Sequence, residues 1–307
     1  MSLTQQANPE PASSPRVADS TIHCNGINGD PVPLNVIIRQ DPLSVTLDGP
    51  AILALSLSLI LSSHLFHPRT ISLLVGSAAA ALFIRNDYQN YLNLGPGGIP
   101  STFPNYLRIS WLKLWALRDP LSPPGLDRTT QPRRGILRAH ALPQRAGPRP
   151  RVVGIVPQRQ IDQRGSETWH LALRGALSRH AEAHESELRT GTSCFEKHGL
   201  GLFARRPARD TCRGEICHVH DSDRSLHLSL HPDDAREVLA KGWGERHPLT
   251  GRAPVPFKIP VPREFTMVYA PRSLDELEVV CRIVEAAEYW VTGRESRIDL
   301  AGEGAGS

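Results

Sequence analysis

The chain has 307 residues and a mass of 33.8 kDa, with 35 Lys and Arg against 31 Asp and Glu and a formal net charge of +4. This length suffices for one large domain or two small ones with a hydrophobic core. The positive charge comes mostly from scattered arginines without a zinc-finger, homeodomain or RNP pattern, which argues against nucleic-acid binding and favours an anionic membrane surface.

The five cysteines are an odd number without a C-x-x-C pair, so the sequence indicates neither a disulfide framework nor a cysteine zinc site. We therefore expect a reducing environment for the main domain. The chain also lacks a G-x-S-x-G nucleophile elbow, a G-x-x-x-x-G-K-[ST] phosphate loop and a G-x-G-x-x-G that opens a helix. These absences argue against hydrolases and nucleotide-dependent enzymes.

The N-terminal part is predicted to be a tail followed by a membrane anchor. Residues 1–49 are rich in Pro, Ser, Asn and Gly and lack the features of a signal peptide, which predicts a disordered tail. Residues 50–85 contain two apolar segments, 51–66 and 71–84, each shorter than the roughly 20 residues of a usual spanning helix. Either one segment spans the bilayer and the other lies at its surface, or both form a hairpin that turns near Pro68. Two buried core helices are the alternative.

Residues 86–150 are predicted to connect this anchor to the main domain. Their first part carries aromatic side chains that either lie at the membrane interface or cover the domain, namely Tyr88, Tyr91, Phe103, Tyr106, Trp111 and Trp115. The stretch from Pro120 to Pro150 is dense in Pro, Arg and Gly, which predicts a mobile linker. If one segment spans the bilayer, basic residues after the anchor and a net acidic tail predict that the main domain lies on the cytosolic side, and a double pass also permits this. We expect the endoplasmic reticulum.

Residues 151–293 are predicted to form the main domain, and residues 294–307 a flexible tail. The predicted strands are 151–156, 194–204, 215–219, 225–230 and 266–270. The predicted helices are 167–182, 232–241 and a last one from the capping residue Ser273 to 291, which Gly293 ends. This order indicates an α+β domain, an antiparallel sheet with helices packed on one face.

Histidines gather in this domain. Because strand side chains alternate, His218 and His220 project from one side of their strand, and His227 on the next strand faces either side, depending on register. Glu196 and His198 form a second same-face pair on the preceding predicted strand.

A loop further along the chain, Gly-Trp-Gly-Glu-Arg-His-Pro-Leu, adds Glu245, Arg246 and His247. Imidazoles transfer protons near neutral pH, and arginine stabilises an oxyanion, so the eight side chains are candidate catalytic residues. Core packing of single histidines and a surface ion pair between Glu245 and Arg246 are the structural alternatives. His218 and His220 with a carboxylate also suit a metal oxygenase, since such a set leaves coordination positions open.

Several runs resemble the fungal luciferase domain in order and approximate spacing. They are Glu215-Ile-Cys-His-Val-His-Asp, Leu226-His-Leu-Ser-Leu, Lys241-Gly-Trp-Gly-Glu-Arg-His-Pro-Leu and Tyr269-Ala-Pro-Arg. The upstream Ile84-Arg-Asn-Asp-Tyr-Gln and Gly95-Pro also resemble the segment that follows the membrane helix of that family. The resemblance covers about residues 71–292, and its most specific part is the Gly-Trp-Gly-Glu-Arg-His-Pro-Leu octet.

The resemblance implies a membrane-bound enzyme that adds O₂ to a hydroxylated styryl-pyrone without an organic cofactor. A peroxide intermediate then loses carbon dioxide and emits light. A base such as His218, His220 or His247 would deprotonate an enol, and Arg246 would stabilise the peroxide anion.

The longer tail, the second apolar segment and the shorter turn after His220 depart from the family pattern, which argues against light emission. We therefore expect a luciferase-like oxygenase or related tailoring enzyme for a pyrone or phenolic natural product. A non-catalytic binding module tethered to a membrane is the alternative.

Overall fold

The structure is a computed structural model. It describes residues 23–25, 31–33, 49–66, 69–125, 131–137, 139, 141–209, 211–250 and 261–300. The predicted turn at Pro68, most of the predicted N-terminal tail and the end of the C-terminal tail lie outside the described residues. Within the N-terminal tail, two short strands, β1 (His23–Asn25) and β2 (Pro31–Pro33), pair in antiparallel fashion.

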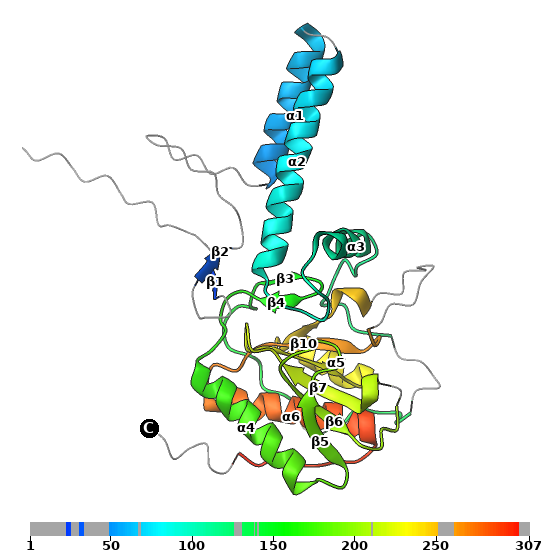
Figure 1. The fold of residues 1–307 in the computed structure, drawn as a ribbon. Helices are drawn as coiled ribbons and strands as arrows, with labels where there is room; N and C mark the ends of the chain where they lie inside the picture. The colour runs from blue at the N-terminus through cyan, green and yellow to red at the C-terminus, as the bar shows by residue number, and fades with distance from the viewer. Residues whose placement is uncertain are drawn as a thin grey trace, which may run out of the picture.

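Both predicted apolar segments are helical, α1 (Gly49–Phe66) and α2 (Arg69–Asn93). The two helices pack side by side and project away from the sheet (Figure 1). Gly76 permits the close approach, since a Cβ there would lie 3.2 Å from the Ile60 side chain. The outer surface is apolar, and Leu73 and Leu74 are each 70% exposed.

A transmembrane helix was predicted for this region. None of the helices in the described part of the chain has the length and apolar content needed to cross a bilayer. Membrane anchoring of this region therefore stays a prediction. Helix α1 has only 18 residues, and the second half of α2 carries Arg85, Asn86 and Asp87.

The main domain is built on a six-stranded sheet. Its strand order is β5-β6-β7-β8-β10-β9, and all neighbours are antiparallel. The strands are β5 (Leu188–Thr192), β6 (Leu200–Ala204), β7 (Glu215–Val219), β8 (Leu226–Ser229), β9 (Gly244–Arg246) and β10 (Phe265–Val268). A separate antiparallel pair consists of β3 (Val152–Gly154) and β4 (Gln158–Gln160).

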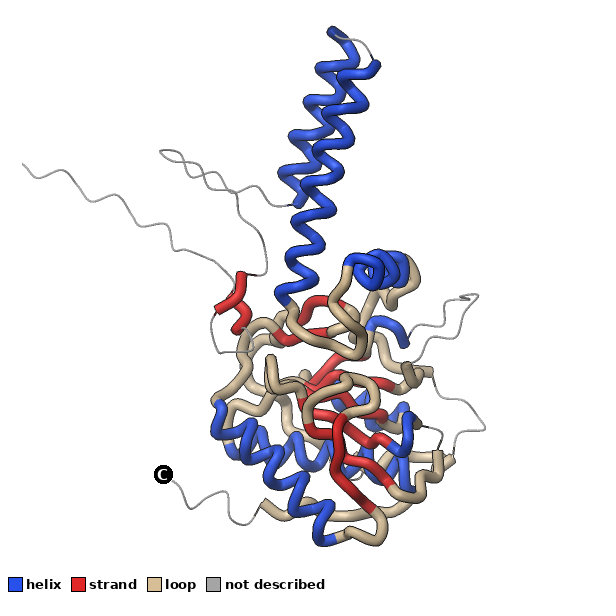
Figure 2. The backbone as a smooth tube through the Cα atoms, in the orientation of Figure 1, coloured by secondary structure: helices blue, strands red, loops and turns tan. Residues whose placement is uncertain are grey.

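The helices complete the predicted α+β fold. They are α3 (Phe103–Lys113), α4 (Glu167–Ala183), α5 (Pro232–Ala240) and α6 (Leu274–Thr292), with 3₁₀ turns at Cys212–Gly214 and Pro248–Thr250. Helices α4 and α6 pack on each other and on the central strands (Figures 1 and 2). Ser273 caps α6 by accepting a hydrogen bond from the Glu276 N–H, and Gly293 ends it with a φ of 76°.

Side-chain alternation divides the sheet into two faces. Leu202, Cys217 and Leu228 lie opposite one another in neighbouring strands and belong to the buried core beneath the helices. The residues between them therefore point to the opposite face. There His218 lies directly opposite His227, and β3, β4 and α3 lie beyond this face (Figure 1).

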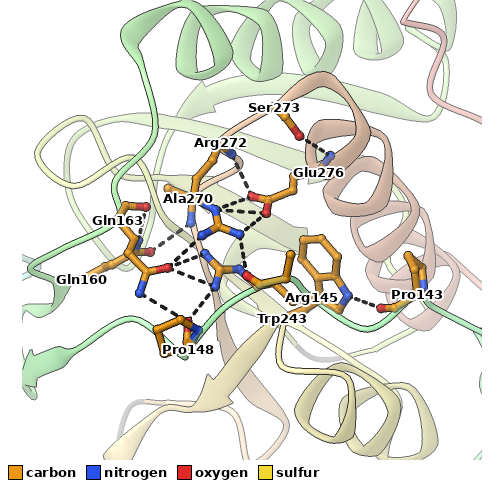
Figure 3. A network of polar contacts seen from close by, with 11 residues as sticks. Pro143, Arg145, Pro148, Gln160, Gln163, Trp243, Ala270, Arg272, Ser273 and Glu276 are labelled. Atoms are coloured by element: carbon orange, nitrogen blue, oxygen red, sulfur yellow. Dashed lines mark hydrogen bonds and ion pairs between the residues drawn. The ribbon is translucent and has the colours of Figure 1, made fainter.

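The stretch predicted as a mobile linker is fastened to the domain where it is described. Leu137 and Leu142 are buried in the core. Figure 3 shows the guanidinium groups of Arg145 and Arg272 donating to the side chain of Gln163, while Trp243 donates to the Pro143 carbonyl. Upstream, Tyr91 and Tyr106 are buried and Trp111 is 56% exposed, so the aromatic segment partly covers the domain.

The strand predicted for residues 194–204 is wrong in its first half. Strand β5 ends at Thr192, and residues 193–199 form the turn that leads into β6. Lys197 and Gly199 adopt φ values of 66° and 70°, which interrupt a strand. Glu196 and His198 therefore do not form a same-face strand pair. Strands β4, β5 and β9 were not predicted.

The structure contains a disulfide, contrary to prediction. Cys194 in the β5–β6 turn is bonded to Cys212, with Cα atoms 6.1 Å apart and a sequence separation of 18 residues. Cys217 and Cys281 are free and buried. The sequence prediction used only the odd number of cysteines and the absence of a C-x-x-C motif. Neither feature identifies two cysteines that come together only in the folded chain.

We expect the variant Cys194→Ser/Cys212→Ser to lose about 3 kcal/mol of unfolding free energy. The disulfide lowers the entropy of the unfolded chain by closing a loop of this size, and the variant lacks that constraint. Guanidinium unfolding followed by circular dichroism measures the change. Reductant should lower the stability of the wild type to that of the variant and leave the variant unchanged. A wild type that is insensitive to reductant under unfolding conditions would contradict the pairing.

Candidate functional site

Four of the predicted histidines come together on the sheet face opposite α4 and α6. The ring centroids of His218 and His227 are 5.4 Å apart, those of His220 and His227 are 4.7 Å apart, and those of His227 and His247 are 5.4 Å apart. All four side chains are buried, with at most 4% exposed. We call these four residues the histidine cluster. The β7–β8 register answers the open question about His227, which lies on the same face as His218.

His218 is held by a carboxylate. Its Nδ1 donates to Glu215 Oε1 over 2.6 Å, and both side chains are almost fully buried. The same carboxylate accepts from the Ser193 hydroxyl and the Cys194 backbone N–H. Because a carboxylate only accepts, Nδ1 of His218 carries the proton, and Nε2 keeps its lone pair. This orientation suits a base or a metal ligand.

His220 is held in the same way. Its Nδ1 lies 3.1 Å from Asp223 Oδ1 and 2.8 Å from Ser225 Oγ, and the Ser225 hydroxyl donates to the other oxygen of Asp223. Asp223 also accepts from the backbone N–H of Gln160 in β4. The proton of His220 therefore sits on Nδ1, and Nε2 faces His227 Nδ1 at 2.9 Å.

The outer nitrogen of His227 contacts an amide. Nε2 lies 2.9 Å from Gln158 Oε1, and the Gln158 amide nitrogen donates to Glu245 Oε1. Glu245 also accepts from the Tyr269 hydroxyl. Glu245 thus acts on the cluster through Gln158, and it is not the surface ion-pair partner of Arg246.

His247 has a different environment. Its Nδ1 accepts from the backbone N–H of Leu249, 3.2 Å away, and its ring faces His227. Burial lowers the pKa of His247 to about 3, although a hydrogen bond with the Ile155 backbone opposes the effect. His247 is therefore a neutral side chain that shapes the site.

Burial also has the largest effect on the pKa values of His220 and His227. It lowers the pKa of His220, with a further contribution from the charge of Arg159, and it lowers the pKa of His227 well below its usual value, together with the neighbouring histidines. For Asp223, burial alone would raise the pKa, but His220 and the Gln160 N–H outweigh it and lower the pKa to about 2. These directions favour neutral rings of His220 and His227 beside an ionised Asp223.

The remaining predicted residues lie at the edge of the site or outside it. Glu196 forms a buried ion pair with Arg159, which also donates to the Pro96 carbonyl. His198 lies in the β5–β6 turn and does not line the cavity. Arg246 pairs with Thr266, which belongs to the sheet face opposite the histidines, and donates to backbone carbonyls. A peroxide-stabilising role for Arg246 does not fit this position.

A cavity of about 790 Å³ lies against the histidine cluster. His218, His227 and His247 border it together with Gln158 and Glu196. The apolar part of its wall consists of Ile99, Ile109, Leu112, Ile155, Phe195, Leu249, Val261 and Phe265. Its volume lies in the range of small-molecule sites. Charged side chains share the lining with the apolar ones, namely Arg108, Glu196, Lys197, Arg263 and Glu264.

Sequence reasoning did not identify the groups that hold the cluster. Glu215 and Asp223 are each three residues from the histidine that they contact, so local spacing contained a signal for them. Gln158 and Arg159 come from β4, and Gln158 precedes His227 by 69 residues. No local pattern connects these two residues with the histidines.

The fold and the site together define an α+β domain with a buried histidine cluster beside a small-molecule cavity. Residues 213–287 match the family model described as Luciferase domain. The chain is 37% identical to a luciferase of Armillaria ostoyae over 238 residues, which is 71% of this chain and 85% of the relative. It is also 34% identical to a luciferase of Armillaria gallica over 273 residues, 80% of this chain and 98% of the relative.

A luciferase of Neonothopanus nambi is 35% identical over 243 residues, 73% of this chain and 86% of the relative. The chain therefore belongs to the fungal luciferase family, as the resemblance predicted. No solved structure matches it.

Proposed function

We propose that this protein is an O₂-consuming, luciferase-like enzyme that acts on a hydroxylated pyrone or phenol in the cavity beside the histidine cluster. The observation that carries the proposal is that His218 borders the cavity while Glu215 holds the proton on its Nδ1, which leaves the lone pair of Nε2 available. Membership of the fungal luciferase family supports the use of oxygen. No organic cofactor is needed in this scheme.

The chemistry begins with ionisation of the substrate. His218 Nε2 accepts the proton of an enol or phenol hydroxyl, and Glu215 stabilises the imidazolium that forms. The resulting anion is electron-rich and donates electrons to O₂, which forms a carbon–oxygen bond and a peroxide. The apolar part of the wall lowers the polarity around this reactive anion.

The cavity also bears on the alternative of a non-catalytic binding module. Binding alone requires shape and a few fixed hydrogen-bonding groups, and it does not require a histidine–carboxylate pair with a free lone pair. His218, His227 and His247 border one cavity, which favours the enzyme.

The test is oxygen uptake by the purified full-length chain with a hydroxylated styryl-pyrone and with simple phenols, while photons are counted. Uptake above the rate with boiled protein supports the proposal whether or not light is emitted. A folded protein that consumes no oxygen with any compound of the panel would contradict it and favour the binding module.

We propose further that the α1–α2 hairpin associates with lipid without crossing the bilayer. Apolar side chains that contact the acyl region of a bilayer leave water, and burial of a leucine side chain contributes roughly 1.5–3 kcal/mol. The support is the row of leucines exposed on the hairpin, which includes Leu65, Leu73 and Leu74.

Flotation with phosphatidylcholine–phosphatidylserine vesicles tests this association. We expect the full-length chain to float, and Leu73→Gln/Leu74→Gln to lower the bound fraction at least 10-fold, because two buried leucines are lost. Leu171→Gln is the matched control, since Leu171 is 58% exposed on α4, away from the hairpin. Equal flotation of all three proteins would contradict the proposal.

A further inference from the structure

Three ring nitrogens converge within the histidine cluster. Nitrogen atoms of His218, His220 and His227 all lie within 4.8 Å of one another, and all three residues are buried. His220 Nε2 and His227 Nδ1 lie 2.9 Å apart, which is closer than van der Waals contact alone would bring two uncharged rings. Which atoms carry protons decides what this arrangement does.

The outer nitrogens of the three rings already have acceptors. Glu215 accepts from His218, and Asp223 and Ser225 accept from His220. The third ring, His227, faces Gln158 Oε1, and the orientation of that amide is fixed by its donation to Glu245. Each ring therefore carries its proton on the outer nitrogen.

Consequently, the inner nitrogens all carry lone pairs. In particular, His220 Nε2 and His227 Nδ1 direct two lone pairs at each other over 2.9 Å. Two such acceptors repel unless a positive charge lies between them. Carboxylates and an amide behind neutral imidazoles are also the outer contacts that metal-bound histidines characteristically make.

The buried charges support the same conclusion. Glu196 is neutralised by Arg159, whereas Glu215 and Asp223 form their ion pairs with histidines. A divalent cation at the ring nitrogens would balance these two carboxylates. Metal–nitrogen bonds of about 2.0–2.1 Å at an angle near 90° place two nitrogens about 2.9 Å apart, which agrees with the His220–His227 separation.

We infer that His218, His220 and His227 bind a divalent first-row transition metal whose open coordination positions face the cavity. The expected third ligand, a carboxylate, is thus replaced by His227. This inference rests on the proposed function and deepens it: the cation would bind the substrate hydroxyl as an oxyanion, with its proton passing to water in the cavity, while His218 Nε2 would be a ligand instead of the proton acceptor. Imidazole ligands suit Fe, Co, Ni, Cu and Zn.

The test uses the purified full-length chain and needs no substrate. We expect mass spectrometry of the elements to find close to one equivalent of a transition metal, and the chelated protein to bind Co²⁺ with visible absorption bands and one-to-one stoichiometry. His220→Ala should abolish this binding. Asp223→Asn keeps the size of the side chain and should weaken Co²⁺ binding 10- to 100-fold by loss of the outer contact. His184→Ala, outside the cluster, is the control.

Circular dichroism establishes that each variant is folded, and Asp223→Asn keeps the test decisive if His220→Ala does not fold. Folded wild type that binds no more Co²⁺ than Asp223→Asn would overturn the inference, as would binding that survives both substitutions. Oxygen uptake by metal-free protein would retain the proposed function and overturn the metal site. Stoichiometric metal without oxygen uptake would do the reverse.

Discussion

His218→Ala is expected to lower kcat for oxygen uptake by at least 100-fold. The substitution removes the ring nitrogen that faces the cavity, and a positioned acid–base group contributes roughly 10²–10⁴-fold to a rate. The same loss is expected if the nitrogen binds a metal, since one of three protein ligands disappears. Because His218 acts on the reacting hydroxyl and the apolar wall remains, KM should change much less than kcat.

Stability has to be separated from chemistry in this experiment. His218→Ala leaves one acceptor site of Glu215 without its partner, which costs about 1–3 kcal/mol, so the thermal midpoint should fall while the protein remains folded at 20 °C. Glu215→Gln is a positioning variant that keeps the ring of His218 and should lower kcat less than His218→Ala. His184→Ala is the control. Unchanged oxygen uptake in folded His218→Ala would remove this residue from the proposed chemistry.

The sequence contained enough information to place part of this site. Strand alternation placed His218 and His220 on one face, and the structure agrees. His227 could not be placed, because a one-residue shift between β7 and β8 would have moved it to the other face. Register depends on the whole hydrophobic pattern of both strands and on the turn, and periodicity within one strand does not determine it.

Other residues were misplaced for physical reasons that are visible in the fold. Glu196 and His198 lie in a turn because left-handed backbone at Lys197 and Gly199 ends the extended segment. Arg246 and His247 are adjacent in sequence, so strand geometry directs their side chains to opposite sides of the sheet edge. Within the octet that carried the family resemblance, His247 therefore borders the cavity and Arg246 lies on the opposite face of the sheet.

The α+β fold followed from long periodic segments such as α4 and α6, whose apolar spacing is strong. Strands β4 and β9 were missed because each has three residues and contains Gln, Arg, Gly or Glu in place of β-branched residues. Strand β5 contains two threonines, but Arg189 and Gly191 weaken its strand pattern. Strand β4 nevertheless supplies Gln158 and Arg159, which contact the site from far away in sequence. Tertiary contacts of this kind have no local signature.

Glu196→Ala is expected to destabilise the domain by about 3–5 kcal/mol, because it leaves Arg159 buried without its anionic partner. The Arg159 side chain is only 4% exposed. Guanidinium unfolding measures the change. The matched control is Glu187→Ala, which removes an ion pair with Arg294 whose side chains are 41% and 65% exposed, and it should cost less than about 1 kcal/mol.

The double variant Arg159→Met/Glu196→Leu distinguishes the structural role of this pair from a chemical one. Replacement of both charges by apolar side chains should recover most of the stability lost in Glu196→Ala, since neither charge then remains buried alone. If Glu196 only positions β4 against the β5–β6 turn, oxygen uptake should recover together with stability. A stable double variant without uptake would instead assign the charges of the pair a part in the chemistry, either through Glu196, which borders the cavity, or through the effect of Arg159 on His220.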